Sequence, residues 1–338
     1  MIKVSVLVAV YNAEKYLNEC LDSLIAQTLQ DIQIICVDDC STDDSLSIIN
    51  KYKEKDNRIE VISLSQNMGQ AHARNVALAR VKGEYITFLD SDDWMSPDAL
   101  QSALAIFEQD ENTDCVLFHG VFHYPNGQDI PYPMHPFIEL SGYKAFVKSL
   151  TWEIHGLYII KSSIHKLFTY DESCKYYSDD NTTRIHYLKS RKVSCCEGTY
   201  FYRQVETSVT HQIDGHRFDY MLANESMKRQ LMELHVSDEI IDIYENVRWL
   251  VVIDSYMFYY MHREELSNED KKYGLSEMKR VWNGIETKRL KLSNRLKFGY
   301  IPMKFSWKLF RIQEEIYFYL RSIKSYFAFL FKARNKTI

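Results

Sequence analysis

The sequence predicts an α/β fold built on a mostly parallel, doubly wound sheet, followed by a helical region. Short β-branched runs alternate with segments whose apolar residues recur at helical spacing, which is the pattern of repeated βαβ units. A length of 338 residues is enough for one large or two ordinary domains. A hydrophobic content of 46% and a charged content of 26% are those of a globular protein.

The first hundred residues alternate between expected strands and helices. Residues 4–10 form a continuous β-branched run and are expected to be a buried strand. Asn12 is expected to cap a helix in which Leu17, Leu21 and Leu24 share one face. Further strands are expected at 32–37, 59–63 and 85–89, with one helix beginning at 41–44 and another over 70–81.

Beyond residue 100 the pattern becomes less regular. Strands are expected at 115–122 and 157–160, separated by a loop that holds most of the chain's 6 prolines. From about residue 218 apolar residues recur at helical spacing, as at Ile240, Tyr244 and Val247. We therefore expect an α/β domain over residues 1–215, with halves 1–100 and 101–215, and a helical region over 216–338.

A crowded group of carboxylates follows the fourth expected strand, in the segment Asp90-Ser91-Asp92-Asp93. Like charges at this spacing repel, so one carboxyl group would stay protonated unless a cation lies among them. From these residues alone two interpretations are equally supported. One is a Mg²⁺ or Mn²⁺ site, because both ions prefer oxygen ligands, and the other is a capped turn before a helix.

Polar residues also follow two other expected strands. Tyr11 and Asn12 come after the first strand, and Asp38 and Asp39 come after the second. In a doubly wound sheet the ligand lies beyond the carboxyl ends of the strands. These residues and the acidic group are therefore expected to meet at one binding edge.

Several common nucleotide-binding signatures are missing from the sequence. It contains neither G-x-G-x-x-G nor G-K-[ST], which argues against a nicotinamide dehydrogenase and a P-loop kinase. An odd number of cysteines, 7, without any C-x-x-C pair indicates reduced thiols and a cytoplasmic location. No apolar run approaches the ~20 residues that a membrane-spanning helix needs.

The last fifty residues are basic and aromatic. From Arg289 to Ile338 there are 12 Lys and Arg against 2 Asp and Glu, in a chain whose net charge is −5. Such a segment suggests an acidic partner. A basic amphipathic helix at the inner face of the cell membrane and a helix packed on the rest of the chain are equally supported. Binding to nucleic acid is not expected.

Several ordered motifs resemble glycosyltransferase family 2, whose members use sugar nucleotides and have the GT-A fold. The matching segments are VSVLVAVYNAEKYLNECLDSLIAQT, IICVDDCSTDDS and NMGQAHARNVALARVKGEYITFLDSDD. The resemblance is nearly complete from Val4 to Leu100 and continues in patches to about His211. Ala9 stands where the family usually has Pro, and Cys40 stands where it usually has Gly. A positive φ in that turn would strain Cys40 mildly.

The resemblance implies which residues bind the donor and its metal ion. Asp92 would bind Mn²⁺ or Mg²⁺ directly, Asp90 would serve the ribose or a metal-bound water, and His211 could complete the metal shell. Asp39 would accept the N3–H of uracil, and Arg74 would balance the charge of the pyrophosphate. The other expected nucleotide-sugar contacts are Ala9, Tyr11, Asn12 and Ser91, with the Tyr11 ring stacked on the base.

The resemblance also implies a catalytic base in the segment KYYSDDNTTRIHYL. Asp180 matches the catalytic Asp of the family and would open a helix below the acceptor, while Asp179 replaces Glu. A neighbouring carboxylate should raise the pKa of Asp180, which suits a general base, although helix capping is the alternative role. Trp152 and Glu153, ahead of Gly156, could line the acceptor.

The implied function is inverting, metal-dependent transfer of a hexosyl or N-acetylhexosaminyl group from a nucleoside diphosphate sugar, with UDP as the expected nucleotide. Residues 1–100 would bind the nucleotide and residues 101–215 the acceptor hydroxyl, on a lipid-linked or growing surface polysaccharide. Two alternatives stay open. A sugar-1-phosphate nucleotidyltransferase normally needs a glycine-rich loop after the first strand, which this sequence lacks, and a non-catalytic sugar-nucleotide-binding subunit would not need Asp180.

Overall fold

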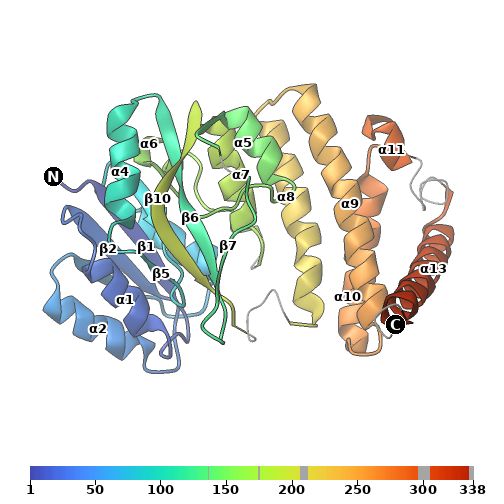
Figure 1. Cartoon of the computed structure of the whole chain (residues 1–338), viewed down its shortest axis with the longest axis horizontal. Helices are drawn as coiled ribbons and strands as arrows, with labels where there is room; N and C mark the ends of the chain where they lie inside the picture. Colours follow the sequence, from blue (N-terminus) through green and yellow to red (C-terminus); the bar gives the residue numbers. More distant parts are fainter. Residues whose placement is uncertain (136, 174–175, 206–211, 296–304, 335–338) are drawn as a thin grey trace. The chain divides into compact units, whose positions relative to one another are not determined.

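The structure, a computed structural model, describes residues 1–135, 137–173, 176–205, 212–295 and 305–334. The chain divides into two compact units, Met1–Ser208 and Val209–Ile338. The first unit alternates strands and helices, and the second is helical (Figure 1). The predicted class, an α/β domain followed by a helical region, is therefore confirmed.

One ten-stranded sheet forms the centre of the first unit. Its strands follow the order β3-β2-β1-β4-β9-β6-β10-β5, while β7 pairs with β6 and β8 pairs with β10. The bounds are β1 Val4–Val10, β2 Ile32–Asp38, β3 Ile59–Ser63, β4 Tyr85–Phe88, β5 Trp94–Met95, β6 Thr113–His123, β7 Asp129–Pro131, β8 Glu139–Ser141, β9 Tyr158–Lys161 and β10 Lys192–Arg203.

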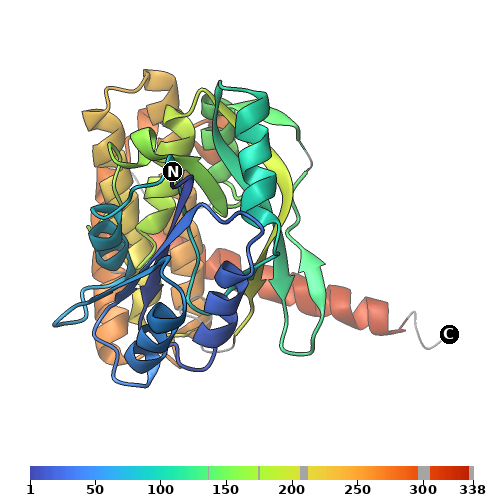
Figure 2. The same ribbon diagram turned by 90° about the vertical axis from the view of Figure 1, so that its left-hand side faces the viewer.

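Strands β1 to β4 pair with one another in parallel, and helices cover both faces of this part of the sheet (Figures 1 and 2). Alternate residues of β1, such as Val6, pack with α1 (Leu17–Ile25), α2 (Ser45–Lys55) and α4 (Ala99–Gln109). Leu7 points to the other face and packs with α3 (Gln70–Leu78). Burial of both faces explains why β1 appears in the sequence as an unbroken apolar run.

Beyond β4 the sheet becomes mixed. β9 runs antiparallel to both β4 and β6, with Thr87 opposite Ile159. The start of an antiparallel strand lies beside the end of its neighbour, so the residues just before β9 reach the carboxyl end of β4. Those residues, 150–157, follow α5 (Gly142–Ser149) and precede α6 (Ser162–His165) and α7 (Asp179–Lys189). The reversal of direction thus brings a loop from the second half of the unit to the acidic edge.

Local structure departs from the predictions at a few positions. The prediction that Asn12 caps α1 is wrong, because α1 begins after Tyr16, and Oδ1 of Asn12 accepts the Thr42 N–H at 2.8 Å instead. Asn12 and Cys40 both have positive φ, 49° and 64°, so the strain expected at Cys40 is present. The proline-containing loop carries the short strands β7 and β8, which the sequence pattern did not indicate.

The second unit contains the helices expected beyond residue 216. They are α8 Tyr220–Glu233, α9 Asp238–His262, α10 Asn268–Gly284, α11 Leu292–Arg295 and α13 Trp307–Arg334, with two short 3₁₀ turns at Gly215–Asp219 and Thr287–Arg289. Trp249, Tyr256, Met278 and Phe310 are buried in its core. Within the described ranges, no helix combines the length and the apolar character that crossing a membrane requires.

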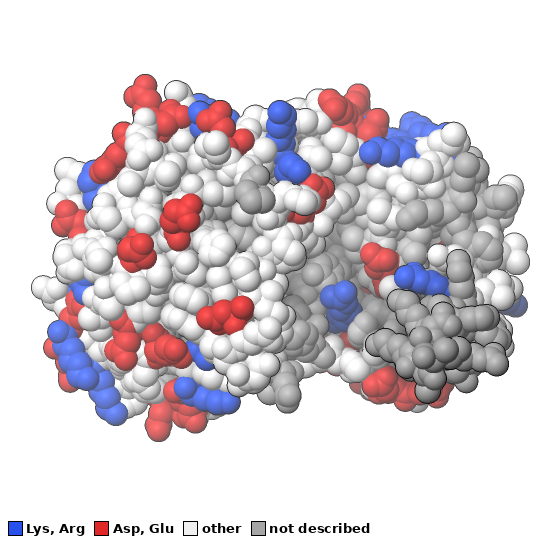
Figure 3. Space-filling view, in the orientation of Figure 1, with Lys and Arg blue, Asp and Glu red and all other residues white. Residues whose placement is uncertain are grey.

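Charged side chains are spread over the visible face of the first unit. Figure 3 shows acidic and basic residues interspersed there, with uncharged surface between them. A face of this kind does not produce a strong field of one sign.

Candidate active site

The carboxyl ends of three parallel strands meet at one edge of the sheet. β1 pairs in parallel with both β2 and β4. Tyr11 and Asn12 follow β1, Asp39 follows β2, and Asp90 follows β4 after one intervening residue. The structure therefore brings these predicted site residues together from positions far apart in the sequence.

Asp39 is buried and holds the loop that leads into α3. Its Oδ1 accepts the Met68 N–H at 2.8 Å and its Oδ2 accepts the Gly69 N–H at 2.7 Å. Gly69 has a φ of 93°, a conformation that favours glycine. Each carboxylate oxygen can accept a second hydrogen bond. The contact of Asp39 with a uracil N3–H stays a prediction, and the observed bonds are compatible with it.

Arg74 is buried on α3 and pairs with the carboxylate of Asp90. The guanidinium lies between two aromatic rings, 4.2 Å from the centre of Phe88 and 5.3 Å from that of Tyr170. Oδ1 of Asp90 also accepts a hydrogen bond from Gln70 Nε2 at 2.9 Å. Nε and Nη1 of Arg74 have no hydrogen-bond partner among the described residues. Arg74 therefore places a positive charge beside Asp90 at this edge of the sheet, and its contact with a diphosphate stays a prediction.

Asp93 does not share the role of its two acidic neighbours. It is fully buried, and its carboxyl group accepts the Tyr200 O–H at 3.0 Å and the Arg203 N–H at 2.8 Å. Burial, followed by the charges of Asp92 and Asp90, raises its pKa well above the usual range. One of the three crowded carboxyl groups thus joins the acidic turn to β10.

Asp92 is half-buried and lacks a side-chain partner. Burial, reinforced by the charge of Asp90, raises its pKa to about 6, while Arg203 opposes the shift. No side chain in the described part of the chain donates a hydrogen bond to its carboxylate. Carboxylate oxygens that repel one another suit Mg²⁺ or Mn²⁺, so Asp92 and Asp90 fit the predicted metal site.

A complete metal shell is not visible in the residues that the structure describes. Within them, no group of three or more His, Cys, Asp or Glu side chains is arranged to hold an ion. His211 lies outside the described residues, so its predicted part in the shell stays a prediction. A diphosphate would have to supply further oxygen ligands.

Asp180 lies in the first turn of α7, as predicted, and is half-buried. Burial raises its pKa to about 7, Asp179 adds to the shift, and Arg184 acts against it. Oδ2 of Asp179 is 3.7 Å from Nη1 of Arg74. Because Arg74 also pairs with Asp90, one buried guanidinium connects the strand-end carboxylates to the helix that carries the predicted base.

The other predicted donor contacts lie at the same edge. Tyr11 is 49% exposed, which leaves it accessible to a ligand. Ala9 is half-buried near the end of β1, and Ser91 is half-buried in the acidic turn. Asn12 ties the end of β1 to the loop after β2 through its bond to Thr42. Their contacts with a nucleotide sugar stay predictions.

Several residues of the site were not predicted. Tyr170 packs against Arg74, and Gln70 donates to Asp90. Tyr200 accepts the Asp90 N–H at 3.1 Å and donates to Asp93, so its hydroxyl fixes both ends of the acidic turn. The position of Gln70 at the start of α3 gave a weak signal. Tyr170 and Tyr200 are distant in the sequence from their partners, and neither was assigned a role from the sequence.

Sequence comparison finds similarity to glycosyltransferases. The family described as glycosyl transferase family 2 matches residues 5–166. A poly(ribitol-phosphate) β-glucosyltransferase of Bacillus spizizenii is 35% identical over 62% of this chain and 33% of its own length. TarS, a poly(ribitol-phosphate) β-N-acetylglucosaminyltransferase of Staphylococcus aureus, is 30% identical over 71% of this chain and 43% of its own. The chain thus spans about a third of the first relative and less than half of the second.

Structural comparison agrees on the fold. S. aureus TarS 1–349 in complex with UDP has a TM-score of 0.71, with 22% identity, and the match covers 93% of this chain and 91% of that one. The same TarS segment in complex with UDP-GlcNAc has a TM-score of 0.73 over the same shares. Together, these comparisons show that residues 5–166 are similar to glycosyl transferase family 2 and that the chain has the GT-A fold of TarS 1–349, followed by a helical region.

Proposed function

We propose that the protein is an inverting glycosyltransferase that moves a hexosyl or N-acetylhexosaminyl group from a UDP-linked sugar to an acceptor hydroxyl. One observation carries the proposal. Arg74 contacts Asp90 at the strand ends and approaches Asp179 at the start of α7, next to Asp180, whose pKa is about 7. The strand-end carboxylates and the start of α7 therefore lie on either side of one fixed positive charge, an arrangement that supports a diphosphate site on one side and a base on the other.

The residues of the chain suggest how the transfer proceeds. Ionised Asp180 accepts the proton of the acceptor hydroxyl as that oxygen attacks the anomeric carbon. The bond from this carbon to the diphosphate oxygen breaks, and the electron pair leaves with UDP. Arg74 stabilises the negative charge that grows on the diphosphate. A single attack from the opposite face inverts the anomeric centre, so that an α-linked donor gives a β-linkage.

The proposal includes a divalent cation. Asp92 and Asp90 are the side chains that would hold Mn²⁺ or Mg²⁺. The bound ion would add to the stabilisation of charge on the diphosphate. Among the residues that the structure describes, no side chain donates to the Asp92 carboxylate, and burial raises its pKa to about 6; both observations support this part of the proposal.

We further propose that the acceptor is a lipid-linked or growing surface polysaccharide. Both relatives described above are named for transfer to poly(ribitol-phosphate). On α13, Leu309, Ile312, Ile316 and Leu320 recur at helical spacing and are each about half exposed. Basic residues outnumber acidic ones over this part of the chain, so peripheral contact with anionic lipid fits. Flotation that is equal with neutral and anionic vesicles would count against the membrane contact.

The donor is tested by a screen of UDP-, GDP- and dTDP-sugars with and without Mn²⁺. We expect release of UDP from UDP-GlcNAc or UDP-glucose by slow hydrolysis when no acceptor is present, and faster release with acceptor. Asp180→Asn should keep UDP binding in calorimetry but lose on the order of 10³-fold in transfer, because it removes the base. Folded protein that binds none of these nucleotides would overturn the proposal, and unchanged transfer by the Asn variant would exclude Asp180 as the base.

A further inference from the structure

Three segments from the second half of the first unit converge beside Asp180. The hydroxyl of Tyr132 donates to the backbone oxygen of Trp152 at 2.9 Å. The guanidinium of Arg184 lies 5.2 Å from the centre of the Trp152 ring. Burial and then the charge of Asp180 raise the pKa of Tyr132, and the charge of Arg184 opposes the rise in the pKa of Asp180. The loop before β9 and the start of α7 therefore form one surface around the proposed base.

Trp152 has two features that core packing does not explain. Its φ is 58°, a conformation that a bulky residue adopts only at a cost in free energy. Its side chain is 39% exposed, so burial of the ring does not offset this cost fully. The backbone is held there by hydrogen bonds from the Trp152 N–H to Ser149 at 3.3 Å and from the Glu153 N–H to Lys148 at 3.1 Å. Strain of this kind is concentrated at functional sites.

Arg184 lies one helical turn after Asp180 on α7, so both side chains are on the same face of the helix. Across the described residues, no carboxylate comes within ion-pair distance of Arg184, and its Nε has no hydrogen-bond partner. Arg184 thus retains donor capacity beside a partly exposed aromatic ring. Arg184 is half-buried, but its Nε is a buried atom, and a buried polar atom without a hydrogen-bond partner requires an explanation.

We propose that Trp152 and Arg184 form the acceptor subsite, in which the Trp152 ring stacks on a sugar or polyol unit and Arg184 binds the phosphate group attached to it. This inference rests on the proposed function, which supplies the reaction but does not identify the acceptor site. It assigns the acceptor class as a phosphate-linked polyol or glycan.

The chemistry of the surface favours this class of acceptor. The flat ring of Trp152 can cover the C–H face of a polyol, and the cation beneath it keeps the ring in place. Asp179 and Asp180 would repel an anionic acceptor, and Arg184 compensates for this repulsion. The planar guanidinium can bind two phosphate oxygens at once, which would fix the attacking hydroxyl relative to Asp180.

The test uses the full chain, UDP-GlcNAc or UDP-glucose as donor, and a ribitol phosphate oligomer as acceptor. Trp152→Ala should raise the KM for the oligomer by about tenfold or more and leave the Kd for UDP within about twofold. Trp152→Phe, which keeps a flat ring, should restore most of the affinity. The unchanged Kd for UDP also establishes that the variants are folded.

Two substitutions of Arg184 separate the contribution of its positive charge from that of its planar guanidinium group. Arg184→Gln should raise the KM for the oligomer by about tenfold or more and weaken its dependence on salt, whereas Arg184→Lys should keep the salt dependence with reduced affinity. Tyr143→Ala is the matched control, because Tyr143 is 37% exposed but lies on α5, whose first residue, Gly142, packs against the far end of α7. The control should leave the KM for the oligomer unchanged.

The possible failures point to different conclusions. If wild-type protein hydrolyses the UDP-sugar but transfers only to neutral glycans, the phosphate-binding role of Arg184 is overturned while the proposed function survives. If Trp152→Ala changes the Kd for UDP as much as the KM for the oligomer, Trp152 is not an acceptor contact. If wild-type protein neither binds nor hydrolyses a UDP-sugar, the proposed function itself has failed.

Discussion

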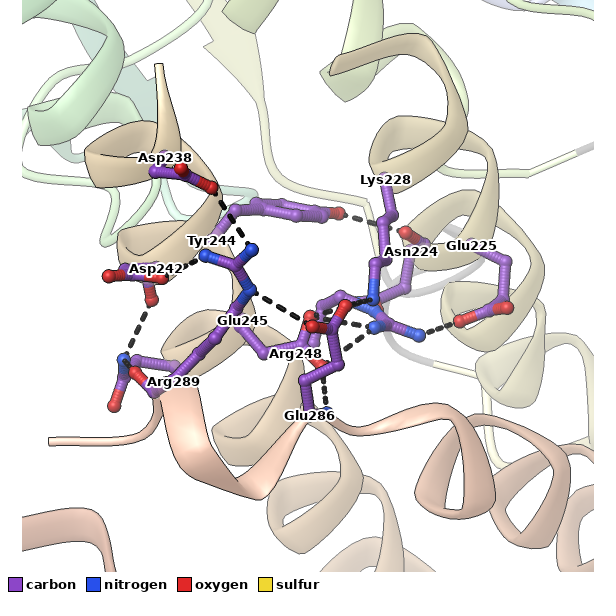
Figure 4. A network of polar contacts seen from close by, with 11 residues as sticks. Asn224, Glu225, Lys228, Asp238, Asp242, Tyr244, Glu245, Arg248, Glu286 and Arg289 are labelled. Carbon is purple, nitrogen blue, oxygen red and sulfur yellow. Dashed lines mark hydrogen bonds and ion pairs between the residues drawn. The ribbon is translucent and has the colours of Figure 1, made fainter. Parts of the chain in front are cut away.

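In the helical unit each nitrogen atom of the buried Arg248 guanidinium has a hydrogen-bond partner, whereas in the α/β unit only Nη2 of the buried Arg74 guanidinium has one among the described residues. Nε of Arg248 donates to Asn224 at 2.9 Å, Nη1 donates to both oxygens of Glu245 at 3.0 and 2.8 Å, and Nη2 pairs with Glu225 (Figure 4). Arg74 pairs with Asp90 and keeps Nε and Nη1 without a hydrogen bond among the described residues.

The acidic groups differ in the same way. Around Arg248 the acidic side chains share several donors: Glu286 accepts from Lys228 at 2.8 Å and from Arg289 at 3.0 Å, and these bonds lower its pKa to about 2 (Figure 4). At the sheet edge Asp92 has no side-chain donor in the described part of the chain, and its pKa is raised to about 6. Uncompensated charge is therefore concentrated where a ligand is expected, which is characteristic of functional sites.

The largest expected effect is on catalysis, from replacing the unsatisfied arginine. Arg74→Met should lower the transfer rate by on the order of 10³-fold, equivalent to about 4 kcal/mol, because a fixed charge next to the leaving diphosphate is lost. Steady-state kinetics with a UDP-sugar would measure the loss. Arg74→Lys is the matched control and should recover part of the rate.

If Arg74 is functional and Arg248 is structural, Arg74→Met should leave the α/β unit folded. Asp90 is partly exposed, so water can hydrate its carboxylate once Arg74 is gone. Circular dichroism and the protection of β1 amides from hydrogen exchange would check this. An unfolded variant would mean that Arg74 has the same structural role as Arg248, and the distinction between the two arginines would disappear.

The next largest effect is on stability, from breaking the saturated network. Arg248→Met should destabilise the helical unit by about 3 kcal/mol, because Glu245 would stay buried without its main partner. Hydrogen exchange of α9 amides reports on this unit separately. The exposed pair of Arg229 and Glu233, 3.9 Å apart, provides the control: Glu233→Ala should change the same quantity by less than about 0.5 kcal/mol. Equal effects of the two changes would contradict the structural role of the network.

Much of the fold could be predicted from sequence because parallel strands covered on both faces leave an unambiguous pattern. The predicted strands at 4–10 and 59–63 have the bounds of β1 and β3. The mixed half was harder, because the direction of β9 depends on pairing with β4 and β6, which are distant in the sequence. Asn12 was misassigned because Asn suits both a helix cap and a left-handed turn, and the contact with Thr42 decides between them.

The sequence predicted which residues form the candidate site better than it predicted which side chains contact them. Asp39, Asp90, Asp92 and Asp180 lie at strand and helix ends, where local sequence signals are strongest. The separation of Asp93 from its neighbours depends on the hydroxyl of Tyr200, more than a hundred residues away. Local sequence patterns carry no information about a contact between residues so far apart. The sequence could therefore identify the crowded carboxylates, but it could not show that Asp93 is the structural one.

A smaller expected effect is the pH dependence of transfer, which tests whether the carboxyl groups of the α/β unit titrate during catalysis. Asp180 must be ionised to accept a proton, and its pKa is about 7. Below pH 7 the value of kcat/KM should fall about tenfold per pH unit, reaching roughly 30-fold at pH 5.5. UDP binding measured over the same range separates this titration from that of the donor site. A flat profile between pH 5.5 and 8 would exclude Asp180 as the group that limits the rate.

The smallest effect is a gain in stability from removing the same carboxyl group. Because the pKa of Asp180 is raised from 3.8 to about 7 in the folded state, folding favours its protonated form. The stabilisation is fully present below pH 4 and is lost as the pH rises through 7. Asp180→Asn cannot ionise, so at pH 8 it should raise the free energy of unfolding of the α/β unit by about 1–2 kcal/mol, with almost no change at pH 4.

Hydrogen exchange of α7 amides at both pH values would measure the difference. Asp31→Asn, at a side chain that is 64% exposed, should have no comparable effect. If Asp180→Asn is instead less stable at pH 8, Asp180 stabilises α7 by capping it, and this effect exceeds the cost of burying its charge. The charge of Asp180 would then be explained by a structural role and would not indicate catalysis.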